Sequence, residues 1–227
     1  MKLLVTDYDN TFELHYDFTD NAAILTRNIY ALNKFMENNI ACIATGRHFD
    51  AIYKTLTEND IKFDYLCANN GAELYGKKYK LLFCLPLEKK DLQLLKSLNK
   101  KVFFRNPYNS ELISSANLYL ENMQEYEEVK KYLNDNLKES FIEYKFPKIK
   151  IINKKCNKAN VINIIKSIEQ LDDKNIYTIG DDINDIQMIL SYNGCSLSTA
   201  CDEVKKITKK IYKELNELIF YIDTMQD

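Results

Sequence analysis

The sequence lacks the features that mark several specialised classes of protein. No charged segment followed by an apolar one opens the chain, and no apolar run reaches the length that a membrane span requires. The six cysteines form no Cys-x-x-Cys pair, and the formal net charge is only −2 over 227 residues. We therefore expect reduced cysteines, no nucleic-acid partner, no membrane partner and a cytoplasmic location.

The composition that remains is typical of a folded globular protein. Hydrophobic residues make up 46% of the chain and charged residues 28%, and the length suffices for one large core or two modest ones. Three cysteines, Cys42, Cys67 and Cys195, fall inside apolar runs that resemble strands. We expect them to act as small buried hydrophobic residues.

Strand-like apolar runs alternate with segments of helical periodicity near both ends of the chain. This alternation predicts repeated βα units, and therefore a parallel sheet. Thr19 or Asp20 is expected to cap the first helix, whose apolar face starts at Leu25. The expected core strands are Leu3–Val5, Ile40–Ala44, Tyr65–Ala68, Ile176–Ile179 and Cys195–Leu197.

The pattern changes in the middle of the chain. Residues 78–152 favour an α+β insertion, which we interpret as a cap, and residues 1–77 and 153–227 form the core. The predicted fold class is α/β, a doubly wound Rossmann-like parallel sheet with an inserted α+β cap domain. The expected cap elements are strands Tyr79–Leu85, Val102–Phe104 and Phe141–Ile152 and helices Glu88–Leu98 and Tyr126–Leu137, with Ser110–Leu120 left unassigned.

Two carboxylates, Asp7 and Asp9, follow the first expected strand, in the pattern Asp-x-Asp-x-Thr that ends at Thr11. A strand tip holds such side chains at a fixed spacing, at the sheet edge where open α/β folds bind ligands. An acidic turn after a strand is the simpler explanation of this segment alone. Other segments of the chain decide between the two.

Three further segments add groups that a phosphate site needs. The second strand is followed by Thr45-Gly46-Arg47, whose hydroxyl and backbone N–H groups can hold phosphate oxygens. Lys158 opens an expected helix, and the strand that ends near Ile179 leads into Gly180-Asp181-Asp182-Ile183-Asn184-Asp185. So many carboxylates repel one another unless a cation joins them, and Mg²⁺ suits a few carboxylates together with a substrate phosphate.

The order of these four motifs resembles that of the haloacid dehalogenase-like phosphatases, and the similarity spans nearly the whole chain. The sequence looks most like the Cof-type, or type IIB, sugar-phosphate phosphatases, which also carry the Asn-Gly-Ala found here at residues 70–72. Asn10 and Ala159 stand where glycine is commoner, and Leu197-Ser198-Thr199-Ala200 replaces the usual Met-Gly-Asn-Ala. Asn tolerates the backbone angles of a tight turn, so we expect the first turn to survive.

The resemblance implies a role for each motif residue. Asp7 is implied as the nucleophile and Asp9 as the general acid and base. Mg²⁺ is implied to be held by the side chains of Asp7 and Asp181 and by the backbone carbonyl of Asp9. The implied substrate is a small phosphorylated metabolite, hydrolysed through an aspartyl phosphate. The implied phosphate-binding residues are Thr45, Gly46, Lys158 and Asn184, and the supporting residues are Thr11, Arg47, Asp182 and Asp185.

Substrate choice is expected to depend on the cap. Its candidate contacts are Arg105, Asn106, Tyr108, Lys148 and Lys150, although ordinary surface positions would also explain them. The two histidines, His15 and His48, are expected to be loop residues. The sequence identifies neither the substrate nor the oligomeric state.

Three other functions stay open at this stage. A phosphomannomutase-like phosphotransferase shares the cap and the Asp pair, and activation by a sugar bisphosphate would distinguish it. A receiver-like signalling module also uses a phosphorylated Asp and a lysine, but it is about half this length and lacks a cap. A binding protein without catalysis is disfavoured because all the reacting groups are present.

Overall fold

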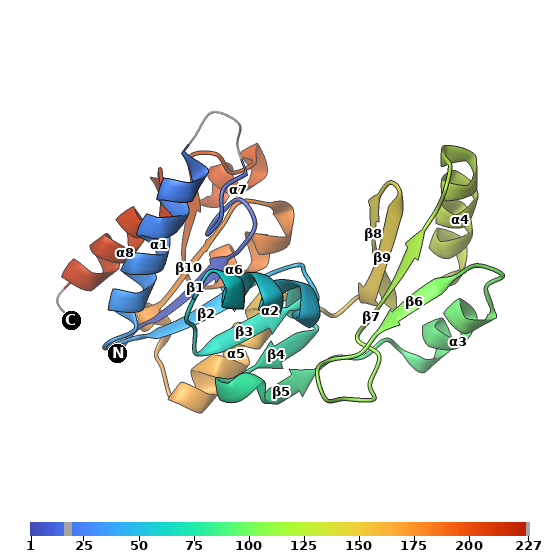
Figure 1. The fold of residues 1–227 in the computed structure, drawn as a ribbon, viewed down its shortest axis with the longest axis horizontal. Helices are drawn as coiled ribbons and strands as arrows, with labels where there is room; N and C mark the ends of the chain where they lie inside the picture. Colours follow the sequence, from blue (N-terminus) through green and yellow to red (C-terminus); the bar gives the residue numbers. More distant parts are fainter. Residues whose placement is uncertain (16–19, 226–227) are drawn as a thin grey trace.

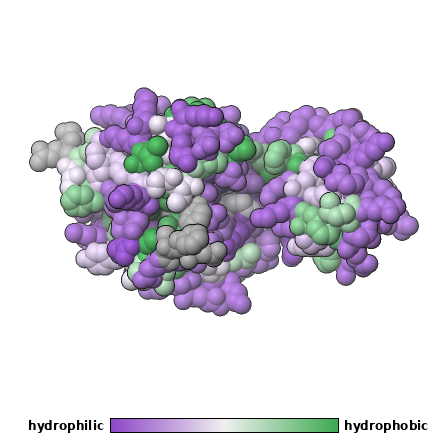
Figure 2. Space-filling view, turned by 90° about the horizontal axis from the view of Figure 1, so that it is seen from above, coloured by the Kyte–Doolittle hydropathy of each residue, from purple (hydrophilic) through white to green (hydrophobic). Residues whose placement is uncertain are grey.

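The computed structural model describes residues 1–15 and 20–225 and contains two separate sheets (Figure 1). The larger sheet has eight strands in the order β12-β11-β10-β1-β2-β3-β4-β5, and the smaller has four in the order β6-β7-β9-β8. Figure 2 shows the molecule as two lobes with a narrower waist between them. The larger lobe is the core and the smaller one is the cap.

Six strands of the core sheet pair in parallel, and β4 and β5 extend one edge through antiparallel pairings. Their bounds, in chain order, are β1 (Leu3–Asp7), β2 (Ile40–Ala44), β3 (Tyr65–Ala68), β4 (Glu73–Tyr75), β5 (Leu81–Cys84), β10 (Ile176–Gly180), β11 (Asn193–Leu197) and β12 (Lys210–Tyr212). The central strands are buried on both faces, which explains their continuous apolar runs.

Helices cover both faces of the core sheet. Leu4 and Leu3 point to opposite faces and join separate apolar clusters, because side chains alternate along a strand. On the face of Leu4 lie α1 (Asn21–Phe35), α2 (Phe49–Glu58) and α8 (Leu215–Thr224), and on the face of Leu3 lie α5 (Lys158–Glu169), α6 (Ile186–Ser191) and α7 (Asp202–Ile207). The core is therefore doubly wound, as predicted.

The cap is an antiparallel sheet with two helices on its outer face, away from the core (Figure 1). Its elements are α3 (Lys89–Ser97), β6 (Val102–Arg105), β7 (Ser115–Tyr119), α4 (Met123–Asn136), β8 (Ser140–Lys145) and β9 (Lys148–Asn153). Leu95 of α3 and Leu133 of α4 pack on Ala116 and Ile149, so one sheet face forms the cap's own apolar core. The other sheet face is turned toward the larger lobe.

Several sequence-based expectations hold at the level of single elements. Strands β2 and β3 have the predicted bounds, and Asp20 caps α1 by accepting a hydrogen bond from the backbone N–H of Ala23 at 3.2 Å. Thr19, the other capping candidate, lies outside the described residues. The three strand cysteines, Cys42, Cys67 and Cys195, are buried as expected.

Three strand expectations need correction. The strand expected in the cap over Tyr79–Leu85 is β5, which pairs with β4 and so extends the core sheet. The three-residue strand β4 is too short to show periodicity, so its hairpin with β5 was not expected. The expected strand Phe141–Ile152 is two strands, β8 and β9, separated by a turn at residues 146–147. The short strand β12 lies where only helical segments were expected.

Among the described residues, every helix is too short or too polar to cross a membrane.

Candidate active site

The strand register brings the carboxyl ends of three core strands together. Asp7 at the end of β1 pairs with Ala44 of β2, and Thr6 pairs with Ile179 of β10. The residues that follow these strands therefore emerge at one edge of the sheet. Thr45 follows β2 and Asp181 follows β10, so both start beside Asp7.

Lys158 joins two carboxylates in a buried network at this edge. Its ammonium lies 2.5 Å from Asp7 Oδ1 and 2.6 Å from Asp185 Oδ1. The side chains of Lys158 and Asp185 are fully buried, and that of Asp7 is 7% exposed. Lys158 is the first residue of α5, which Asn157 caps through its side-chain oxygen. The network combines residues from β1, α5 and the turn after β10.

The protonation tendencies of these groups follow from burial and from one another. Burial lowers the pKa of Lys158, but the carboxylates of Asp185 and Asp7 more than offset this, so its pKa lies above the ordinary value. Burial raises the pKa of Asp7, Lys158 acts against that rise, and Asp185 adds to it. Burial and the nearby Asp185 raise the pKa of Asp181 to about 6. The cluster thus has an excess of negative groups that one lysine does not neutralise.

Two glycines allow the chain to approach the network closely. Gly71 has a φ of +92°, and a Cβ there would lie 2.5 Å from the Asn157 carbonyl oxygen, next to Lys158. A Cβ at Gly180 would lie 2.4 Å from Asp185 Cγ. Any larger residue at either position would displace Lys158 or Asp185. The glycines therefore position the two charged partners.

Three carboxylates lie close enough to share a cation. One oxygen from each of Asp7, Asp181 and Asp185 falls within 4.8 Å of the others. Asp185 is already engaged, because Oδ1 contacts Lys158 and Oδ2 accepts the backbone N–H groups of Asp181 and Asp182 at 3.1 and 3.2 Å. Thr11 donates to Asp181 Oδ1 at 3.1 Å. Hard carboxylate oxygens beside excess negative charge fit Mg²⁺, and Asp7 and Asp181 are the ligands best placed to hold it.

Asp9 lies outside this carboxylate cluster. Arg47 donates two hydrogen bonds to its carboxylate, from Nε to Oδ2 at 3.1 Å and from Nη2 to Oδ1. The Arg47 guanidinium also lies 5.1 Å from the centre of the Tyr8 ring. His15 is also near, with Nε2 at 3.8 Å from Asp9 Oδ1. Arg47, one of the expected supporting residues, therefore pairs with a carboxylate.

The remaining motif residues surround the network in different ways. The buried Thr45 hydroxyl accepts the backbone N–H of Arg47 at 3.0 Å, which shapes the loop that contains Gly46. Asn184 is exposed and donates to Asn70 Oδ1 at 3.0 Å. Asp182 caps its own turn by accepting the Ile183 N–H at 2.7 Å, and it makes no contact with Lys158.

The cap candidates divide into two groups. Tyr108 stacks on Phe49, with ring centres 5.0 Å apart, and its N–H donates to the Tyr75 hydroxyl at 3.0 Å, so it joins the cap to the core. Asn106 donates to the carbonyl of Leu112 within its own loop at 2.8 Å. The cationic candidates Arg105, Lys148 and Lys150 instead lie near His48, where burial and then Arg105 lower the pKa of this histidine.

Sequence reasoning missed a buried acid at the junction of the lobes. The Glu73 carboxylate accepts hydrogen bonds from Asn69 at 2.5 Å, from Ser114 at 2.5 Å and from Tyr75 at 2.6 Å. Ser114 directly precedes β7 of the cap, so Glu73 joins the two lobes. The sequence offered one signal, an acid in an apolar segment directly after Asn70-Gly71-Ala72.

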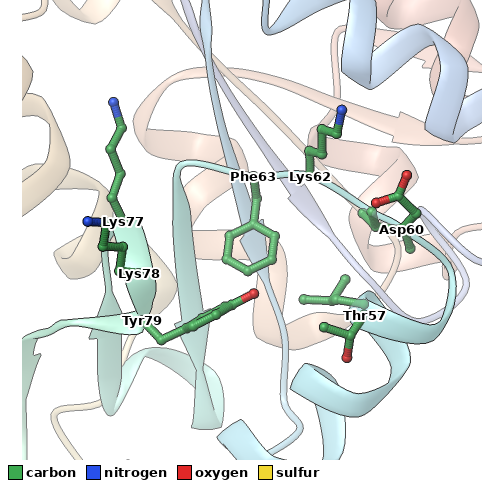
Figure 3. Close-up of a pocket in the computed structure, with 10 residues that line it drawn as sticks. Thr57, Asp60, Lys62, Phe63, Lys77, Lys78 and Tyr79 are labelled. Carbon is green, nitrogen blue, oxygen red and sulfur yellow. The ribbon is translucent and has the colours of Figure 1, made fainter.

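A separate hollow of about 360 Å³ lies at the end of α2, against residues 76–79. It contains none of the motif residues. Figure 3 shows the ammonium groups of Lys62, Lys77 and Lys78 pointing away from the space between Tyr79 and Thr57. These cations do not converge on a ligand, so the strand edge is the better candidate.

Solved structures of similar fold and one family model match this chain. No curated protein sequence matches the chain. The fold is similar to that of a protein from Thermotoga maritima, with a TM-score of 0.80 at 14% identity, covering 100% of this chain and 98% of that one. The fold is also similar to that of a phosphatase from Bacteroides thetaiotaomicron, with a TM-score of 0.76 at 16% identity, covering 99% of this chain and 96% of that one. A subclass IIB sugar phosphatase has a similar fold as well, with a TM-score of 0.73 at 15% identity, covering 99% of this chain and 100% of that one.

These TM-scores, over nearly the whole length of each chain, show a shared fold that includes the cap. The family itself is shown by sequence, since the model for haloacid dehalogenase-like hydrolases matches residues 4–123 and 99–218. That match extends over most of the chain and includes every motif of the strand edge. The chain therefore belongs to the haloacid dehalogenase-like hydrolases.

Proposed function

We propose that this protein is a Mg²⁺-dependent phosphatase that hydrolyses small phosphorylated metabolites through an aspartyl phosphate on Asp7. The observation that carries the proposal is the buried contact of Lys158 with Asp7 and Asp185, beside Asp181, at the carboxyl edge of the sheet. The sugar phosphatase and the other phosphatase of similar fold support the same class of substrate.

The first step forms a bond between Asp7 and phosphorus and breaks the bond to the leaving alcohol. Lys158 contacts Oδ1 of Asp7, which leaves Oδ2 to attack. The side chains of Asp7 and Asp181, together with the Asp9 backbone carbonyl, would hold Mg²⁺, whose positive charge would offset the repulsion between the carboxylate and the phosphate. The Thr45-Gly46 loop and Asn184 hold the remaining phosphate oxygens.

Asp9 moves protons in both steps. It gives a proton to the leaving alkoxide, and then as a carboxylate it removes a proton from the water that attacks phosphorus. That attack releases inorganic phosphate and restores Asp7. The two hydrogen bonds from Arg47 to Asp9 have to break before Asp9 can reach a leaving group. We expect substrate binding beside Arg47 to break them.

Phosphate release from a panel of small phosphate esters tests the proposal. EDTA should abolish release and added Mg²⁺ should restore it, and Asp7→Asn should reduce kcat by at least about 10³-fold because the nucleophile is lost. Asp181→Ala should raise the Mg²⁺ requirement sharply, whereas Asp182→Ala should raise it less. Activity that survives both EDTA and Asp7→Asn would refute the proposal. A larger rise in the Mg²⁺ requirement for Asp182→Ala than for Asp181→Ala would refute the assignment of Asp181 as the ligand.

A further inference from the structure

The cap sheet presents a patch of polar side chains on the face opposite its apolar core. Asn117 of β7 pairs with Lys150 of β9, and Ser115 of β7 pairs with Arg105 of β6. Cross-strand partners lie on the same sheet face, and positions two apart along a strand share that face too. The four side chains are therefore neighbours, and we call them the cap patch.

The cap patch faces the catalytic edge of the core. The Lys150 ammonium donates to the carbonyl of Gly46, in the loop that follows β2. Arg105 and Lys150 both lie close enough to His48 to affect its pKa. In Figure 1, α3 and α4 cover the other face of the cap sheet, away from the core. A substrate whose phosphate sits at Asp7 would extend its leaving group toward this patch.

Polar atoms of the cap patch are buried without partners. Among the described residues, the buried side-chain atoms that lack a hydrogen-bond partner include Arg105 Nε, Ser115 Oγ and Asn117 Oδ1. Ser115 is fully buried and Asn117 is 2% exposed. Native proteins leave few buried polar atoms unpaired, and three on neighbouring strands indicate a place where a ligand supplies the partners.

The charge of the cap patch is also unbalanced. Lys150 is 7% exposed, and no carboxylate in the described part of the chain lies within ion-pair distance of its ammonium. Glu143 is its cross-strand neighbour on the same sheet face, but its side chain is exposed and forms no ion pair with Lys150. Glu73 is occupied by its own three hydrogen bonds. Arg105 adds a second cation that can bind two oxygens at once. A neutral leaving group would leave both cations unpaired.

We propose that the leaving group of the substrate carries a second anionic group, bound by Lys150 and Arg105 and hydrogen-bonded by Ser115 and Asn117. This inference rests on the proposed phosphatase function and names the class of substrate for it. A carboxylate and a second phosphate offer the same chemistry, oxygens with negative charge at one end of the molecule. The two sources differ in size and are separated by experiment.

The test uses matched pairs of substrates that differ in the second group. One pair is 2-phosphoglycolate and 2-hydroxyethyl phosphate, and the other is fructose 1,6-bisphosphate and fructose 1-phosphate. We expect kcat/KM to be at least about tenfold higher for the anionic member of one pair, which identifies carboxylate or phosphate. Lys150→Met and Arg105→Met should remove that preference by raising KM for the anionic member more than KM for the neutral member.

The matched control is Lys131→Met, which removes one exposed cap charge on α4 and should leave the preference intact. Lys150→Arg should restore most of it, because the charge returns. Equal use of both members in both pairs, or equal loss on every substrate in Lys150→Met and Arg105→Met, overturns the inference while phosphatase activity stands.

Binding separates failure of the inference from failure of the proposed function. Calorimetry with Asp7→Asn measures Kd for each member of a pair without turnover. A Kd about tenfold lower for the anionic member supports the inference even if no hydrolysis is found. This difference in Kd should disappear in the double variant that combines Asp7→Asn with Lys150→Met. Equal Kd values for both members overturn it whatever the enzyme hydrolyses.

Discussion

Two lysines are buried among the described residues, Lys158 in the core and Lys150 in the cap, and their surroundings differ. Lys158 contacts two carboxylates, and together they raise its pKa above the ordinary value despite burial. Lys150 contacts a backbone carbonyl, and burial lowers its pKa to about 8. A buried charge with two close counter-charges is stabilised, whereas one without any is costly to keep.

The difference separates the two tasks that this protein performs under our proposal. The core network is complete before any substrate arrives, so its groups are already aimed at the reacting phosphate and need little reorganisation. The cap patch is incomplete and gains its missing partners only from a ligand. Chemistry is thus fixed in the core, and recognition is left to groups that a suitable leaving group must satisfy.

The largest expected effects come from removing each buried lysine in turn. Lys158→Met leaves Asp7 and Asp185 buried without their cation, so we expect a free energy of unfolding lower by about 3–5 kcal/mol and loss of activity on every substrate. Lys150→Met removes a charge that has no counter-ion, so the free energy of unfolding should stay the same or rise by about 1 kcal/mol. Urea denaturation at pH 7 without substrate measures both. Equal destabilisation by the two substitutions would contradict the comparison.

The next effect concerns the core alone and depends on the leaving group's acidity, not on its charge. Asp9→Asn removes the proton donor, so hydrolysis of alkyl phosphates should fall by about 10²–10⁴-fold. An aryl phosphate such as p-nitrophenyl phosphate needs no proton to leave, so the first step should survive and the second should stall. Rapid quench should then show a burst of nitrophenol close to one equivalent. Absence of a burst, with both substrates slowed alike, would assign Asp9 to metal-site geometry instead.

The arrangement of the candidate site could be predicted from sequence because its residues lie at strand ends. Asp7 ends β1 and Thr45 directly follows β2, and a parallel sheet brings such positions together without further information. The partner of Arg47 could not be predicted in the same way. Its pairing with Asp9 depends on the path of two loops, and side-chain reach in loops has no sequence period.

The cap was harder to predict for a different reason. Ser115 and Asn117 lie in a segment that carries only a five-residue strand, and polar residues on one face of it read as surface. Their burial arises from the neighbouring lobe, which sequence periodicity does not describe. Short strands β4 and β12 were missed because three residues cannot display an alternation.

The smallest expected effect is a pH dependence of substrate preference that originates at Lys150. Burial holds its pKa near 8 in the free enzyme, Glu143 and Glu73 raise it and Lys148 lowers it, so the ammonium form prevails at pH 7 and is lost as the pH rises through 8. The ratio of kcat/KM for the anionic and neutral members of a pair should therefore fall by about tenfold between pH 7 and pH 9.

The ratio isolates this lysine because both members of a pair share the core chemistry. Titration of the catalytic groups changes both rates alike and cancels, and the transferred phosphate stays fully ionised across this range. Lys150→Arg keeps its charge at pH 9, so its ratio should be constant, and Lys150→Met should give a low, constant ratio. If the ratio falls between pH 7 and pH 9 as much in Lys150→Arg as in the wild type, the titrating group is not Lys150. That result would contradict a role for Lys150 in recognising the charge of the substrate.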